Sequence, residues 1–106
     1  MSFKVRFAPG AEQDLERLFD VRLERAGSVE DLDAAQRLID SQRLTITSGL
    51  ALTPYSFRKA GDGRRSTRRE LIVPAGSTGY VALYEIDSAA SVLVLAVRHQ
   101  LESDYH

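Results

Sequence analysis

The sequence predicts an α+β domain: an N-terminal strand and an antiparallel helical hairpin, then a three-stranded antiparallel β-meander, with the helices packed on one face of the sheet. Three observations support this prediction: apolar alternation at the N-terminus, helical periodicity over residues 11–46, and three strand-like runs after residue 67. With 106 residues, 43% of them hydrophobic and 27% charged, the chain is long enough for one core. We therefore expect a single domain, residues 1–106.

The N-terminal segment FKVRF alternates Phe3, Val5 and Phe7 with basic residues, which is the period-two pattern of a half-buried strand. Pro9 suits the first turn of a helix, where its missing N–H costs nothing. From there to about Arg25, leucine and phenylalanine recur at spacings of three and four residues, which predicts an amphipathic helix.

A second helix follows after one or two residues, so the two helices should form an antiparallel hairpin. Ser28 and Asp31 give its start the pattern of a capping box. Asp33 and Arg37 are spaced for an ion pair on the exposed side. The predicted apolar side consists of Leu32, Ala35, Leu38, Ile39 and Ile46.

Three strand-like runs complete the chain: RRELIV up to Pro74, GYVALYEI after a Gly/Ser turn, and SVLVLAV after the turn at Asp87 and Ser88. The last run is apolar at every position from Val92 to Val97. We therefore expect it to be a central strand that is buried on both faces.

Composition excludes several classes of function. The chain has no cysteine, and hence no disulfide, thiolate nucleophile or cysteine-based zinc site. No apolar run is long enough to span a bilayer, and the N-terminus MSFKVRFAPG lacks a signal-peptide pattern, so we expect a cytoplasmic protein with no membrane partner. A formal net charge of -1 argues against a general nucleic-acid coat protein.

Positive charge is concentrated in FRKAGDGRRSTRRELIV, whose first thirteen residues, the basic segment (residues 57–69), contain six Arg or Lys. Residues 12–40 carry nine acidic side chains against four basic ones, so the protein is polarised. Arginine donors match carboxylates and phosphates, which makes the segment a candidate surface for an acidic protein or an RNA backbone. It is equally consistent with an ordinary solvated loop. The candidate partner-binding residues are Arg58, Lys59, Arg64, Arg65, Arg68 and Arg69.

The C-terminal segment VRHQLESDYH carries a second group of candidates. His99, with Arg98 and Tyr105 nearby, has the chemistry for proton transfer and charge stabilisation in a phosphoryl transfer. The alternative is a strand end whose imidazole hydrogen-bonds a carboxylate. The spacing matches no metal motif, and we expect neither a metal nor another cofactor. Tyr80 and Tyr84 are four residues apart and share a strand face. They could stack on bases, but we prefer the interpretation that they lie at the edge of the core with their hydroxyls at its rim.

Five motifs follow one another in the order VRFAPGAEQDLERL, LTPYSFR, RREL, TGYVALYEID and VLVLAVRHQLESDYH. In this order, over nearly the whole chain, they resemble the RelE/ParE superfamily of toxins from bacterial type II toxin–antitoxin (plasmid-stabilisation) systems. The resemblance implies a cytoplasmic toxin that a cognate antitoxin neutralises. The disordered end of such an antitoxin folds across the toxin with apolar and acidic residues, which a basic segment beside a sheet edge suits.

The superfamily divides by target. Members that cut ribosome-bound mRNA place basic residues on the second strand and an Arg directly after the Tyr that opens the third. Here Arg69 keeps a basic position on the second strand, but Leu71 is not basic and Val81 stands where the later Arg would be. We therefore favour the ParE-like branch, whose members inhibit DNA gyrase by binding and have no catalysis of their own.

Two alternatives stay open. The first is a RelE-like, metal-independent endonuclease of ribosome-bound mRNA, in which the RNA 2′-hydroxyl attacks and the catalytic residues are Arg69, Arg98, His99 and Tyr105. The second is an inactive toxin homologue that only binds the antitoxin.

Overall fold

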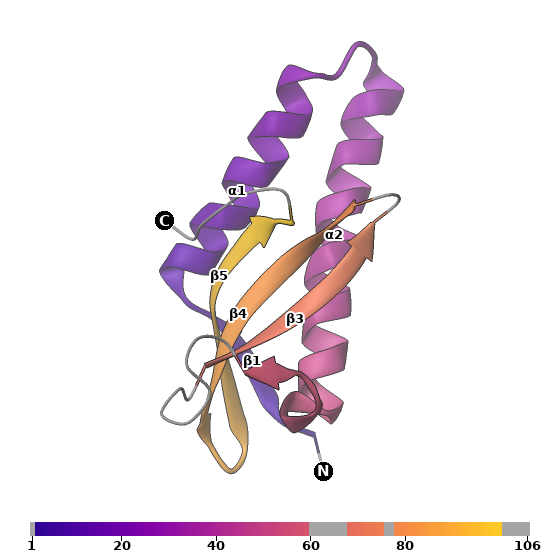
Figure 1. Ribbon diagram of the computed structural model, residues 1–106. Coiled ribbons are helices and arrows are strands. Elements are labelled where there is room, and N and C mark those ends of the chain that lie inside the picture. The colour runs from indigo at the N-terminus through magenta and orange to yellow at the C-terminus, as the bar shows by residue number, and fades with distance from the viewer. Residues whose placement is uncertain (1, 60–67, 76–77, 101–106) are drawn as a thin grey trace.

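The computed structural model describes residues 2–59, 68–75 and 78–100 (Figure 1). In chain order the elements are β1 (Lys4–Phe7), α1 (Pro9–Glu24), α2 (Val29–Leu52), the short 3-10 helix η1 (Pro54–Ser56), β2 (Arg58–Lys59), β3 (Arg68–Ala75), β4 (Thr78–Ser88) and β5 (Ser91–His99). The predicted order of strand, helical hairpin and three-stranded meander is confirmed.

The strands form one sheet in the order β1-β5-β4-β3-β2. β3, β4 and β5 pair antiparallel as predicted, whereas β1 pairs parallel with β5, from Lys4 opposite Ser91 to Phe7 opposite Val94. The sheet is therefore mixed and not wholly antiparallel. The apolar pattern of one strand does not specify its direction relative to a distant partner, and the long connection from β1 to β5 permits a parallel pair.

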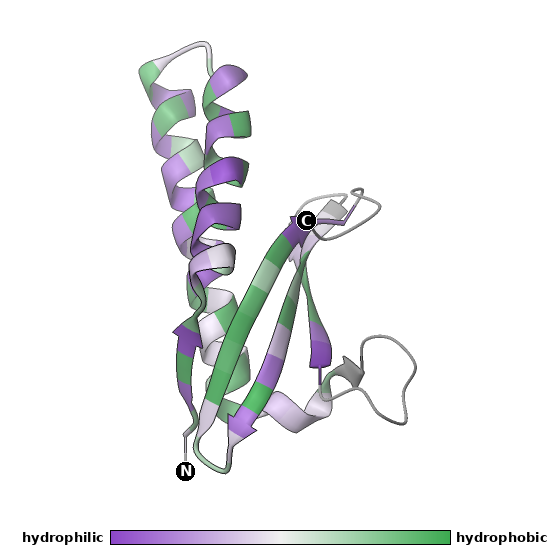
Figure 2. Cartoon of the chain, turned by 90° about the vertical axis from the view of Figure 1, so that its left-hand side faces the viewer, coloured by the Kyte–Doolittle hydropathy of each residue, from purple (hydrophilic) through white to green (hydrophobic). Residues whose placement is uncertain are grey.

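Both helices cover the same face of the sheet, and the hairpin extends beyond the ends of the strands (Figure 2). The core between the two layers is formed mainly by Leu15, Leu18, Ile39, Ile46, Leu50, Leu71, Val73, Tyr80, Tyr84, Val92, Val94 and Val97. Leu32 lies near the far end of the hairpin and is 42% exposed, although we expected it on the buried side. The periodicity of α2 marks a face correctly, but it does not show how far the sheet reaches along that face.

β5 lies between β1 and β4, so it is an inner strand, as the apolar run predicted. It is not buried on both faces, however, and the most deeply buried strand is β4. Every residue from Tyr80 to Tyr84 is buried, and β4 lies in the middle of the sheet. In β5 buried and half-buried positions alternate up to Ala96, and a bulge shifts the register between the pairs Leu83–Ala96 and Tyr84–Val94. Before the bulge, the apolar side chains of β5 that point away from the helices are therefore half-buried, and those that point toward the helices are buried.

A buried carboxylate joins α1 to β5. β1 ends at Phe7, so the outer edge of β5 beyond Val94 has no strand partner among the described residues. Asp14 of α1 is 1% exposed, and its Oδ2 accepts a hydrogen bond from the backbone N–H of Val97 at 2.8 Å. The side chain satisfies a donor that the sheet leaves open.

We expect Asp14→Ala to lower the free energy of unfolding by about 1–3 kcal/mol, because the buried N–H of Val97 loses its acceptor. Asp14→Asn keeps a carbonyl oxygen at that place and should lose less. Urea unfolding of the two variants measures the difference. An alanine variant within about 0.5 kcal/mol of the original protein would contradict the assignment.

One arginine of α2 contacts both α1 and β1. Arg43 of α2 donates from Nη1 and Nη2 to the two carboxylate oxygens of Glu12 in α1, at 2.6 and 2.8 Å. Its guanidinium also lies over the ring of Phe7, 5.0 Å from the centroid. The hydrogen bonds from Arg43 lower the pKa of Glu12, while burial opposes the shift and the Arg43 charge adds to it.

Because the folded-state pKa of Glu12 is lowered, the pair's contribution to stability is complete above the ordinary carboxyl pKa of 4.5 and is lost as pH falls through the lowered pKa. A double-mutant cycle of Glu12→Gln and Arg43→Gln should give a coupling of about 0.2–1 kcal/mol at neutral pH and almost none in acid, measured by urea unfolding. Asp33 and Arg37 provide the matched control. Among the described residues these two make no ion pair, contrary to our expectation, and their coupling should be near zero at both pH values.

Candidate partner interface

The basic segment begins where the chain leaves α2 through η1, and Arg69 holds its two ends together. Arg69 Nη1 donates to the carbonyl oxygens of Tyr55 and Phe57, at 3.1 and 2.8 Å. The guanidinium also lies 5.7 Å from the centroid of the Tyr55 ring. In the sheet, the backbone of Lys59 pairs with that of Arg69 itself. The start and the end of the basic segment are thus fixed against each other.

From the core, Tyr84 contacts η1 and the residue that follows it. Its side chain is fully buried and meets the ring of Phe57 edge to face, with the centroids 6.5 Å apart. Its hydroxyl donates to the carbonyl oxygen of Pro54. Burial raises the pKa of Tyr84 to about 12, and the Arg69 charge opposes the shift. Tyr84 therefore belongs to the core as we preferred, but its hydroxyl lies inside and not at the rim.

The other candidate partner-binding residues take different positions. Arg68 and Arg69 are consecutive in β3, so their side chains point to opposite faces of the sheet, and Arg68 is exposed. Arg58 and Lys59 form β2 at the edge of the sheet. Outside the described residues lie Arg64 and Arg65.

At the end of β5, Arg98 and His99 also lie on opposite faces. His99 is on the helix side, where its ring meets that of Tyr80 edge to face with the centroids 5.4 Å apart. Arg98 is on the other side, paired across the sheet with Val81. Arg98 Nη1 donates to the carbonyl oxygens of His99 and Gln100, at 3.3 and 3.4 Å. Its guanidinium thus contacts the end of its own strand.

The structure does not bring the described catalytic candidates together. Arg69 lies opposite Tyr84, and His99 lies opposite Tyr80, so about 13 Å of β4 separates them at about 3.3 Å per residue. Arg98 lies on the other face of the sheet. These three side chains therefore do not surround a common point where a scissile phosphate would sit.

Val81, which stands in place of an arginine in the mRNA-cleaving branch, is 1% exposed. Its neighbours across the sheet are Ile72 and Arg98. Valine fits this covered place between two strands, whereas an arginine would have to leave it to keep its charge in water. The fourth catalytic candidate, Tyr105, lies outside the described residues.

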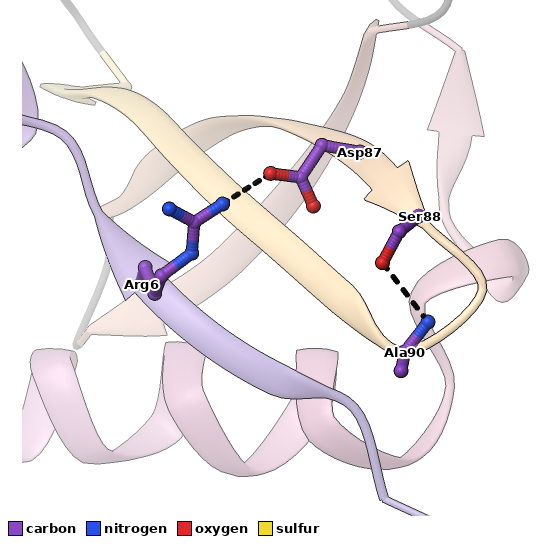
Figure 3. A network of polar contacts seen from close by, with 4 residues as sticks. All are labelled: Arg6, Asp87, Ser88 and Ala90. Carbon is purple, nitrogen blue, oxygen red and sulfur yellow. Dashed lines mark hydrogen bonds and ion pairs between the residues drawn. The ribbon is translucent and has the colours of Figure 1, made fainter.

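A further cation on the face without helices is paired within the sheet. Arg6 of β1 reaches across β5 and forms an ion pair with Asp87 of β4 (Figure 3). Close by, the Ser88 hydroxyl accepts a hydrogen bond from the backbone N–H of Ala90 at 3.2 Å, in the turn that joins β4 to β5 (Figure 3). These contacts join the strands at this end of the sheet, and Asp87 neutralises Arg6.

Sequence reasoning missed two apolar side chains next to the basic segment. Leu52 ends α2 and is 71% exposed, and Tyr55 follows in η1 and is 61% exposed. The motif LTPYSFR contains the residue that indicates this exposure, Pro54. Pro54 cannot continue a helix, so the chain turns there, and the residues on either side of the turn reach the surface. Tyr55 lies beside Arg69, whose guanidinium is over the Tyr55 ring, and Leu52 is three residues earlier in the chain.

The sequence profile described as "ParE toxin of type II toxin-antitoxin system, parDE" matches residues 5–103. The chain belongs to the ParE toxin family. Among solved structures, a chain of the "Chromosomal ParDE TA system from P. aeruginosa" is similar, with a TM-score of 0.68 and 9% identity over 92% of this chain and 96% of that one. At this identity the likeness concerns the fold alone. A search of curated proteins found no match.

The family match confirms the resemblance that the ordered motifs indicated, including the ParE-like branch. In the parts of this ParE-family chain that the structure describes, neither helix has the length and apolar character needed to cross a membrane.

Proposed function

We propose that this protein is the toxin of a type II toxin–antitoxin system, that a cognate antitoxin neutralises it, and that it poisons DNA gyrase by binding. The match to the ParE toxin family over residues 5–103 is the observation that carries the proposal. The separation of Arg69, Arg98 and His99 in the sheet supports binding over RNA cleavage, since a nuclease needs such groups around one phosphate.

The surface just before the basic segment supports the proposal of an antitoxin partner. Exposed Leu52 and Tyr55 supply apolar anchors, and the basic segment, which follows them in the chain, supplies positive charge. A partner segment with acidic and apolar residues complements both features and orders itself on binding. The similar solved chain comes from a ParDE TA system, which agrees with a two-component assembly here.

Co-expression with the protein encoded by the neighbouring small open reading frame tests the antitoxin. The two proteins should purify as one complex at micromolar concentration, and co-expression should restore growth that the toxin alone arrests. Two proteins that elute separately, with growth unchanged by the second, would contradict the proposal.

We expect His99→Ala and Tyr105→Phe to retain growth arrest within about twofold, because a toxin that acts by binding needs no proton transfer from these side chains. Growth curves after induction, at matched protein levels, measure the effect. In a nuclease the loss of a general acid or base lowers the rate by about a hundredfold or more. Loss of arrest in both folded variants would therefore favour the mRNA endonuclease. Absence of arrest in the unmodified protein would favour the inactive homologue.

A further inference from the structure

The side chain of Arg69 contacts the protein's own backbone. One nitrogen donates to two backbone carbonyl oxygens, those of Tyr55 and Phe57, and the guanidinium lies over the Tyr55 ring. Phe57 directly precedes β2, and β2 pairs back onto Arg69. The same residue therefore contacts the chain where the basic segment begins and belongs to the strand in which it ends.

A second set of contacts holds η1 and Phe57, where the chain turns from α2 into β2. The Tyr84 hydroxyl bonds the Pro54 carbonyl oxygen, and Tyr84 packs edge to face on Phe57. The Tyr55 ring meets the ring of Phe3 edge to face, with the centroids 6.0 Å apart. Within this network the Arg69 side chain connects η1 to β3, in which the basic segment ends. A lysine ammonium could donate to the same two carbonyl oxygens, but its flexible stem lacks the planar guanidinium that lies over the Tyr55 ring and holds these bonds in one geometry.

We propose that Arg69 is a positioning residue for antitoxin binding, an inference that rests on the proposed function. Arg69 fixes the beginning of the basic segment, residues 57–59, and the orientation of Tyr55. It does not itself contact the antitoxin's acidic residues. Fixing the described ends of the segment, residues 57–59 and 68–69, before binding lowers the entropy cost of forming the complex. Arg69 was a candidate for direct partner contact and for catalysis, and its contacts assign it a third role.

Hydrogen exchange of the free protein provides the first test, using Arg69→Lys, Arg69→Gln and the neighbouring Arg68→Gln. The backbone N–H groups of residues 57–59 should exchange faster in both Arg69 variants than in the unmodified protein and in Arg68→Gln. The amides of β4, which report global stability, should keep most of their protection in all three variants. Unchanged exchange at residues 57–59 in Arg69→Gln would overturn the proposal. This measurement needs no partner, so its outcome is independent of the proposed function.

Binding of the protein encoded by the neighbouring reading frame, at several salt concentrations, provides the second test. Arg69→Lys and Arg69→Gln should both weaken binding by about tenfold with the salt dependence unchanged, since both disturb the contacts to Tyr55 and Phe57 and neither loses a charge that contacts the partner. Arg68→Gln should reduce the salt dependence. If Arg69→Lys binds like the unmodified protein while Arg69→Gln loses affinity and salt dependence together, Arg69 contacts the partner directly and the proposal fails. If the unmodified protein itself does not bind, the proposed function fails, and hydrogen exchange alone decides the role of Arg69.

Discussion

Reversing three charges of the basic segment, by Lys59→Glu, Arg64→Glu and Arg65→Glu, is expected to weaken antitoxin binding by about a hundredfold or more. The antitoxin is expected to carry acidic residues, and placing like charges opposite one another costs several kcal/mol, where about 1.4 kcal/mol is a factor of ten. Arg69 is left in place because it contacts the protein's own backbone. Isothermal titration or surface plasmon resonance with the purified partner measures the change.

The matched control carries the same change in net charge elsewhere. Arg22, Arg25 and Arg37 lie on the helical hairpin and are exposed, and their side chains make no hydrogen bond or ion pair among the described residues. Reversing these three charges should change affinity by less than about threefold at physiological salt, since screening limits the reach of charge to about 8 Å. Equal losses in the two triple variants would mean that overall charge, and not the basic segment, attracts the partner.

The second large effect is expected at Tyr84. Tyr84→Phe removes the hydroxyl that donates to the Pro54 carbonyl oxygen and should lower the free energy of unfolding by about 1–3 kcal/mol. Tyr84→Ala also empties a fully buried place and should cost about 3–5 kcal/mol. Tyr55→Phe is the matched control: Tyr55 is 61% exposed, and its variant should stay within about 0.5 kcal/mol. Urea unfolding compares the variants.

The same tyrosine predicts the response to alkali. The folded-state pKa of Tyr84, about 12, lies above its ordinary value of 10.0, so the folded state holds this proton more tightly than the unfolded chain. Its contribution is complete below pH 10.0 and is lost as pH rises through about 12. Stability measured across this range should fall less steeply in Tyr84→Phe than in the unmodified protein. An equally steep decline in both would assign the alkaline transition to other groups.

The fold was largely predictable because local patterns determine its elements. The Ser28 hydroxyl accepts from the Asp31 N–H at the start of α2, as the capping pattern indicated, and the antiparallel pairing of β3, β4 and β5 follows from short turns. The parallel pairing of β1 and the deep burial of β4 depend on partners far away in the sequence. No periodicity within a single segment contains that information.

The candidate interface was predictable in its charge and not in its contacts. Composition located the basic segment and the family resemblance singled out Arg69, but both assigned Arg69 to a partner or to catalysis. Its actual contacts are backbone carbonyls at Tyr55 and Phe57, and any residue type supplies such acceptors, so the sequence carries no mark of them. Likewise, Arg98 and His99 are neighbours in the sequence and point to opposite faces because they share a strand.

A supercoiling assay with purified DNA gyrase, run beside a cleavage assay with ribosome-bound mRNA, tests the central claim most directly. We expect the purified protein to inhibit supercoiling and to leave trapped, cleaved DNA, while the mRNA stays intact and added antitoxin restores supercoiling. Cut mRNA with unaffected gyrase would contradict the account, and would make Arg98, His99 and Tyr105 the residues that catalyse the reaction.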